Sequence, residues 1–129
     1  MKTETRECVQ SAEENFTVAD FVFRRRTKVG ANSIAFHCQE SVKRYLIACL
    51  EESGLPVPRT RNMVALVMPL LRQHPLWAGF KPALRMLNNY EIECLYPGHT
   101  ATRANAREAL KACRLIRGDI RLSLGLPKK

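Results

Sequence analysis

Residues 103–124, RANAREALKACRLIRGDIRLSL, decide the fold class of this chain. At about 100° per residue their apolar side chains fall in one arc of about 120°, the pattern of an amphipathic helix that packs on a core. A second arc of the same predicted helix holds only Lys and Arg. The apolar arc is Ala106, Ala109, Leu110, Cys113, Ile116, Ile120 and Leu124, and the basic arc is Arg103, Arg107, Lys111, Arg114, Arg117 and Arg121.

The basic arc has two interpretations, a solvated helix face or a stripe that binds phosphate groups or an acidic partner. A solvated face ordinarily intersperses acids for (i, i+4) pairing, and here only Glu108 and Asp119 do so. Residues 102–129 carry eight Lys or Arg and two acids, out of a formal net charge of +9 for the whole chain. This balance favours a polyanionic partner.

The same helical period continues upstream. Ser53-Gly54 and the following prolines end the second predicted helix. Gly30 marks the break between the first two helices, with Asn32 or Ser33 as the N-cap of the second. The apolar seam of the first helix is Val9, Ala12, Phe16, Ala19 and Phe23, and that of the second helix is Ala35, Cys38, Val42, Tyr45 and Cys49. The first seam is followed by a run of cations, whose charges suit the negative end of a helix dipole. These cations are Arg24, Arg25, Arg26 and Lys28.

The middle of the chain predicts two further helices. Asn62 is the expected N-cap of a helix from Met63 to about Gln73, and residues 74–82 are expected to form a turn in which Trp77 and Phe80 pack inward. The fourth helix follows and ends before residues 96–98, and Thr100 or Thr102 caps the last helix, which runs to about Leu124.

Composition predicts one domain over residues 1–129, with its core in about 8–125. The chain lacks an apolar run long enough to span a membrane and an N-terminal secretory h-region. Its five cysteines are odd in number, without a C-x-x-C pair, so we expect mostly buried free thiols and a cytoplasmic protein.

No phosphate-binding loop, nucleophile elbow or metal-binding motif is present, and the three histidines lie far apart, so we predict no metal and no cofactor. The outward face of the second helix carries His37, Glu40, Lys43 and Arg44, with Glu40 and Arg44 in the favourable (i, i+4) order. This face is either simply solvated or part of a ligand-binding groove shared with Arg61 and Tyr96.

Three segments in the right order resemble the HEPN domain family. Residues 36–50, FHCQESVKRYLIACL, resemble the family's F-x-x-Q-Q-x-x-E-K-x-L-K-A-x-L helix, and residues 58–66, PRTRNMVAL, are similar to its P-x-T-H-D-L-x-x-L segment. Residues 87–90, LNNY, and 94–98, CLYPG, look like its L-x-x-Y and R-Y-P stretch. The resemblance implies an all-α, antiparallel up-and-down bundle of four to five helices.

The resemblance also implies a homodimer, binding of a nucleotide or RNA, and a nucleotidyltransferase partner in a toxin–antitoxin or defence system. Ribonuclease members carry an Arg-x(4–6)-His motif, which this chain lacks. We therefore expect a non-catalytic binding module acting through Arg61 and the basic arc. The alternatives are a metal-independent ribonuclease with His37 as acid/base group beside Arg44 or Arg61, and a simple homo-oligomerisation module.

Overall fold

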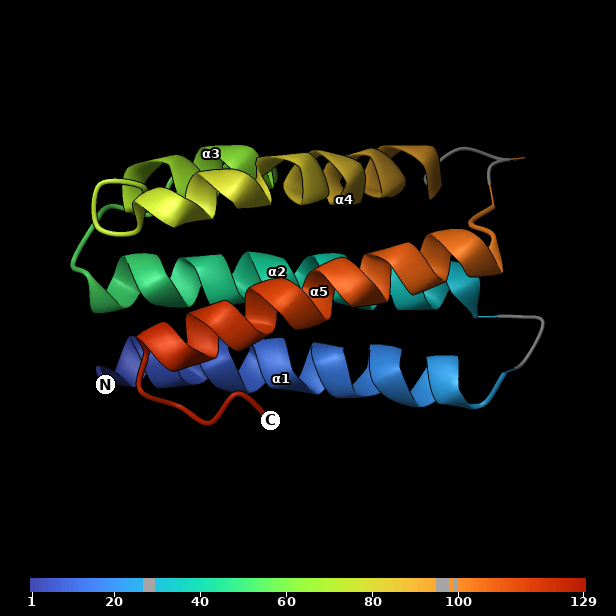
Figure 1. Cartoon of the computed structure of the whole chain (residues 1–129), viewed down its shortest axis with the longest axis horizontal. Coiled ribbons are helices and arrows are strands. Elements are labelled where there is room, and N and C mark those ends of the chain that lie inside the picture. The colour runs from blue at the N-terminus through green and yellow to red at the C-terminus, as the bar shows by residue number, and fades with distance from the viewer. Residues whose placement is uncertain (27–29, 95–97, 99) are drawn as a thin grey trace.

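The computed structural model describes residues 1–26, 30–94, 98 and 100–129, and in this part of the chain it contains helices and no strand. Helices α1 (Thr3–Arg24), α2 (Ala31–Glu52) and α5 (Arg103–Ser123) form one side of an elongated antiparallel bundle. The short α3 (Met63–Val67) and α4 (Lys81–Cys94) cover α2 on its other side (Figure 1). The predicted all-α bundle is therefore confirmed.

The predicted apolar seams form the core. On α2 the seam residues Ala35, Cys38, Val42, Tyr45 and Cys49 are all buried. The apolar arc of α5 is buried except for Leu124, which is half-buried and packs against the core. Because a seam of period 3.6 can be removed from water only when the segment is helical, burial on this pattern accounts for the fold.

The start of α2 differs from the expectation. Its N-cap is Gly30, whose φ of 106° is left-handed, and the predicted caps Asn32 and Ser33 lie inside the helix. Glycine adopts this φ without a steric cost, so the helix begins two residues earlier than a cap at Asn32 would place it. The amide oxygen of Asn32 instead accepts a hydrogen bond from the Ala101 backbone N–H at 2.6 Å, joining α2 to the segment before α5.

The third predicted helix is shorter than expected. Asn62 caps it as predicted, accepting from the Val64 backbone N–H at 3.0 Å, but α3 ends at Val67 and continues as a 3₁₀ turn, η1 (Met68–Leu70). Pro69 has no N–H for the α-helical ladder, which explains the early end.

The expected turn over residues 74–82 is a second 3₁₀ helix, η2 (Pro75–Phe80), and α4 begins directly after it at Lys81. Pro82 is tolerated there because the first turn of a helix needs no internal N–H bond. Trp77 and Phe80 are buried as expected, and the Trp77 ring stacks on His74 at a centroid distance of 3.9 Å.

The N-cap of the last helix, α5, is Thr102, one of the two caps predicted for it. Thr102 accepts from the Asn105 backbone N–H, and the Asn105 side chain accepts from the Thr102 N–H, so the two form a capping box.

Cysteines also follow the expectation where they are described. Cys38, Cys49 and Cys113 are buried free thiols, and Cys8 is half-buried. Burial raises the pKa of Cys49 to about 12, so this thiol stays protonated and unreactive. The side chain of Cys94 lies outside the described residues.

Candidate functional site

The basic arc of α5 divides into two groups with different surroundings. Arg117 and Arg121 point into the molecule. Arg117 is 9% exposed and donates to Glu13 of α1 through Nε at 2.7 Å and Nη2 at 2.6 Å, while its guanidinium lies 4.4 Å from the centre of the Phe16 ring. Arg121 donates to the hydroxyl of Tyr45 at 3.1 Å. Both arginines therefore serve the packing of α1, α2 and α5.

Glu13 is the common acceptor of this inner cluster. The Tyr45 hydroxyl donates a short hydrogen bond to it, and Arg121 lies 3.5 Å from Oε1. Burial would raise the pKa of Glu13, but the hydrogen bonds from Arg117 and Tyr45 and the charges of Arg117 and Arg121 outweigh burial and lower this pKa below its ordinary value.

The cluster also holds the chain after α5. Arg117 donates to the backbone oxygen of Lys128 at 2.9 Å, and Arg121 donates to that of Pro127 at 2.5 Å. The last residues consequently run back across α1 (Figure 1).

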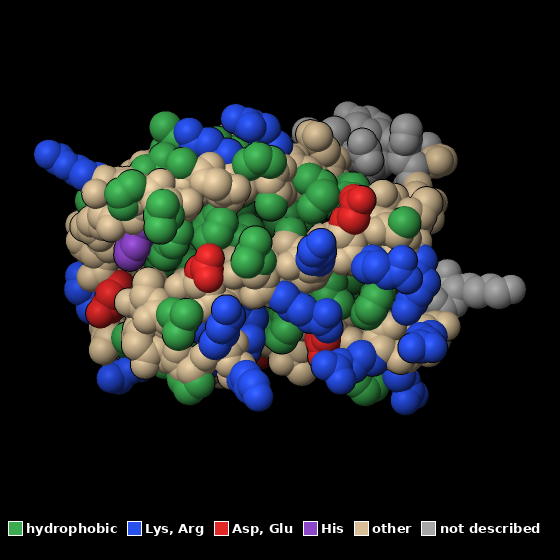
Figure 2. Space-filling view, viewed as in Figure 1, with side chains coloured by type: hydrophobic (Ala, Val, Ile, Leu, Met, Phe, Trp, Pro, Cys, Tyr) green, Lys and Arg blue, Asp and Glu red, His purple; other side chains and the backbone are tan. Residues whose placement is uncertain are grey.

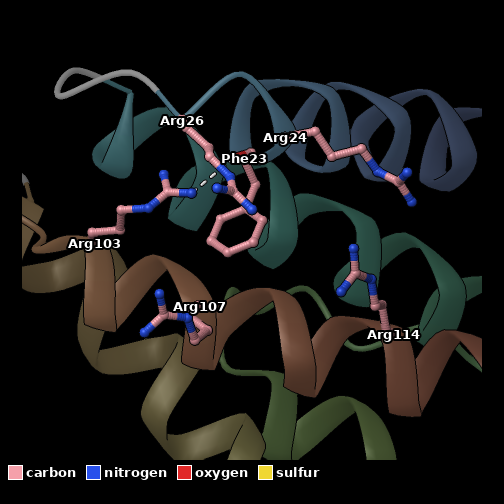
Figure 3. A pocket seen from close by; sticks show the side chains of 6 residues that line it. All are labelled: Phe23, Arg24, Arg26, Arg103, Arg107 and Arg114. Carbon is pink, nitrogen blue, oxygen red and sulfur yellow. Dashed lines mark hydrogen bonds between the residues drawn. The ribbon is translucent and has the colours of Figure 1, made fainter.

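Arg103, Arg107 and Arg114 have a different setting, an open pocket of about 580 Å³ between the end of α1 and the start of α5. Figure 3 shows their guanidinium groups around this pocket together with those from α1 and the residues after it. In Figure 2 the same end of the molecule displays a concentration of Lys and Arg side chains. The complete lining is Phe23, Arg24, Arg26, Arg103, Arg107 and Arg114.

Two of the pocket arginines share one carboxylate. Asp20 contacts Arg114 Nη2 at 2.5 Å and Arg24 Nε at 2.9 Å. Arg103 donates to the Phe23 backbone oxygen at 3.0 Å and covers the Phe23 ring at 4.4 Å. These contacts orient three guanidinium groups and leave the positive charge of the pocket largely uncompensated.

The other two, Arg26 and Arg107, make no side-chain hydrogen bond or ion pair with any residue in the described ranges. Arg26 has a left-handed φ of 54°, which is uncommon for a residue with a side chain and carries a conformational cost. This backbone turns the chain off α1 and places the Arg26 side chain over the pocket (Figure 3).

The sequence predicted a helix-dipole role for Arg24 and Arg26, and did not predict their place beside α5. The run of three arginines after an amphipathic helix was visible in the sequence. Its proximity to α5 was not, because that proximity depends on how the helices pack in the tertiary structure. Lys111 lies outside the pocket, on an apolar groove between α4 and α5.

Four of the six residues predicted to line a ligand-binding groove on α2 lie together around Glu40. Glu40 lies 2.9 Å from Lys43, 3.3 Å from Arg44 and 4.0 Å from Arg61, which comes from the segment before α3. Burial would raise the pKa of Glu40, but the hydrogen bond from Lys43 and the three cations outweigh it and lower this pKa. All three cations therefore share the single Glu40 carboxylate, which neutralises one of their three positive charges.

His37 does not join this cluster. Its Nδ1 lies 2.7 Å from the side-chain oxygen of Asn15 on α1, and its ring meets Phe36 edge to face. The described part of the chain shows no hydrogen bond between His37 and Arg44 or Arg61. Tyr96, the remaining predicted ligand-binding residue, lies outside the described residues.

The described residues lack two further features. They contain no group of three or more His, Cys, Asp or Glu side chains able to hold a metal ion. None of their helices combines the length and the apolar character needed to cross a bilayer.

Comparison with known proteins identifies the family. Neither a curated protein nor a solved structure matches the chain. The family model of the HEPN domain matches residues 5–122, which is most of the bundle and includes both sides of the arginine pocket. The chain therefore belongs to the HEPN domain family.

Proposed function

We propose that this HEPN domain is a non-catalytic binding module whose arginine pocket holds the phosphate groups of an RNA strand. The observation that carries the proposal is the convergence of five arginines from α5 and the end of α1 on one open pocket, where Asp20 forms ion pairs with two of them, Arg24 and Arg114. Arginine suits this task because its planar fork donates two parallel hydrogen bonds to a phosphate.

The extent of the pocket favours a strand over a single nucleotide. Arg103 and Arg114 are eleven residues apart on α5, which is about 16 Å along a helix. Cations spread over such a length match several successive phosphates, whereas one nucleotide would reach only part of them. The phosphate chemistry is the same for both ligands, so the experiment compares them directly.

The test measures binding of a labelled single-stranded RNA by fluorescence anisotropy over a salt series, with AMP and ATP as competitors. The double variant R26E/R107E reverses the two arginines that lack a protein partner, so the internal ion pairs of the fold are kept. Loss of two phosphate contacts lowers the slope of log affinity against log salt by about 1.4.

The matched control is R59E/R72E, which makes the same change of charge at exposed positions away from the pocket. The control is expected to bind RNA almost as well as the natural chain. Equal loss in both double variants would contradict the proposal, since it would mean that net charge alone attracts RNA. Displacement of RNA by ATP at low concentration would favour a nucleotide as the ligand.

A nucleotidyltransferase partner, and a place in a toxin–antitoxin or defence system, are further proposals that rest on the family resemblance. Affinity purification from native cells at low salt tests them. A stoichiometric nucleotidyltransferase that survives nuclease treatment would support the partnership, and nuclease-sensitive RNA would support the arginine pocket as the functional surface.

A further inference from the structure

One stretch of the chain carries positive charge with no acid to balance it. Residues 53–90 contain five Lys or Arg and no Asp or Glu, although the whole chain has 12 acidic residues. This stretch forms α3, η1, η2 and most of α4, the layer that covers α2 on the side away from α1 (Figure 1). Its positive charge therefore belongs to one layer of the bundle.

Four cations of this layer have no partner in the described part of the chain. The side chains of Arg59, Arg72, Lys81 and Arg85 make no hydrogen bond or ion pair with any described residue. The three arginines among them are exposed and Lys81 is half-buried. The layer thus keeps several unpaired positive charges at the surface, and Figure 2 shows Lys and Arg side chains beside apolar ones along the edge that this layer forms.

The same layer exposes two large apolar side chains. Leu76 of η2 is 91% exposed and Met68 of η1 is 49% exposed. In the described part of the chain, Leu76 is the most exposed large apolar side chain. Burial of such a side chain in an apolar medium is favourable, so this position gains from any surface that takes it out of water.

The turn that carries Leu76 is held against the core. Trp77 and Phe80 of the same 3₁₀ helix are buried. The backbone N–H of His74 donates to the Leu70 oxygen at 2.9 Å, and that of Trp77 donates to the His74 oxygen at 3.0 Å. Because its neighbours are fixed in this way, the Leu76 side chain projects from the bundle.

Cations flank Leu76 on both sides along the chain. Arg72 comes four residues before it, Lys81 five residues after it, and Arg85 one helical turn beyond Lys81. With a rise of about 2.0 Å per residue in the 3₁₀ helix and about 1.5 Å in α4, Leu76 and Arg85 are separated by about 16 Å along the two helices. We name Met68, Arg72, Leu76, Lys81 and Arg85 the basic corner.

We propose that the basic corner docks this chain on the surface of an anionic lipid bilayer, with the Leu76 side chain inserted among the lipid headgroups. Binding of a protein to a membrane surface draws on apolar insertion and on attraction between cations and anionic lipids, and the corner supplies both. Each Lys or Arg close to such a surface raises the affinity about fivefold.

The apolar part of the corner favours a bilayer over an RNA strand. The same cations attract RNA phosphates, but Leu76 and Met68 offer an RNA strand neither a hydrogen bond nor an aromatic ring for stacking. The arginine pocket lies between α1 and α5, on the other side of α2. Membrane docking therefore does not rest on the proposed RNA binding, and each can fail without the other.

The test measures flotation of the full chain with vesicles of phosphatidylcholine and phosphatidylglycerol in a two-to-one ratio. Vesicles of phosphatidylcholine alone are the comparison. The affinity for the anionic vesicles should be at least about tenfold higher and should fall as salt is added, because salt screens the attraction. Equal affinity for both kinds of vesicle, or binding to neither, would overturn the proposal.

A charge reversal tests the cations. R72E/R85E removes two of them and should weaken binding to the anionic vesicles at least about thirtyfold. The matched control is R26E/R107E, which makes the same change of charge in the arginine pocket and should stay within about threefold of the natural chain. Equal loss in both variants would mean that net charge alone attracts the vesicles, which contradicts the proposal.

A second pair of variants tests the inserted leucine. L76E should weaken vesicle binding at least about tenfold, because the apolar insertion is lost. L122E makes the same substitution at a leucine of α5 that is 57% exposed, and should bind as the natural chain does. Both side chains are exposed, so both variants should keep the circular dichroism spectrum of the natural chain. Unchanged binding by L76E would overturn the proposal.

The single tryptophan of the chain reports which face docks. Trp77 is the sequence neighbour of Leu76. Phosphatidylglycerol vesicles with lipids brominated near the headgroup end of the acyl chain should quench its fluorescence in the natural chain and in L122E, but not in L76E. Vesicle binding of the natural chain without this quenching would mean that another face meets the membrane, and would contradict the proposal.

Discussion

Replacing Glu13 by Gln tests whether the inner cluster holds α1 against α5. The substitution keeps the size of the side chain and removes its charge, which leaves Arg117 without its counter-ion at 9% exposure. Breaking a buried ion pair by removing one partner costs about 3 to 5 kcal/mol. Because 29% of the Glu13 side chain is exposed and Gln still accepts one hydrogen bond, we expect about 2 to 3 kcal/mol for E13Q.

The partner substitution, R117M, should cost less, about 1 to 2 kcal/mol. It leaves Glu13 with Arg121 at 3.5 Å and with the Tyr45 hydroxyl, so the carboxylate remains paired. The double variant E13Q/R117M should lose less than the sum of the two, since neither side chain is then left with a buried unpaired charge.

Urea denaturation of the four proteins followed by circular dichroism measures these free energies of unfolding. Acid adds an independent check. The pKa of Glu13 is lowered by folding, so its contribution is complete above the ordinary carboxyl pKa of about 4.3 and is lost as the pH falls through the lowered value. The stability difference between the natural chain and E13Q should therefore shrink in that range. A cost for E13Q below about 0.5 kcal/mol near neutral pH would refute the reasoning.

Three smaller predictions test local features by thermal or urea denaturation. Gly30→Ala should cost about 1 to 2 kcal/mol, because φ is 106° at the N-cap of α2, and an equally stable variant would contradict the need for glycine. Asn62→Ala should cost about 1 to 2 kcal/mol, because it removes both the cap of α3 and the acceptor for Asn88 at 2.8 Å, while the exposed Asn89→Ala serves as control. His37→Ala should cost about 1 kcal/mol through the lost contact with Asn15 and leave RNA binding unchanged; metal-independent RNA cleavage abolished by this variant would instead support the ribonuclease alternative.

The fold could be predicted because its signal is local. The apolar residues of α1, α2 and α5 repeat every three or four positions, and each repeat can be recognised from its own segment alone. The helix ends were harder to predict from the sequence. Gly30 competes with Asn32 and Ser33 for the same cap, and the choice depends on Asn32 reaching Ala101, a residue remote in sequence.

The helical class and the family of this chain could be predicted because apolar periodicity and short motifs involve residues that are neighbours in the sequence. The same periodicity placed six cations on one face of α5, where they are chemically alike. The packing of the helices separates these cations into two groups. Arg117 and Arg121 turn inward to Glu13, while Arg103, Arg107 and Arg114 meet the arginines at the end of α1. The sequence could not show this difference, because the role of a charged side chain depends on the residue that it pairs with. The partner of Arg117 lies 104 residues away along the chain.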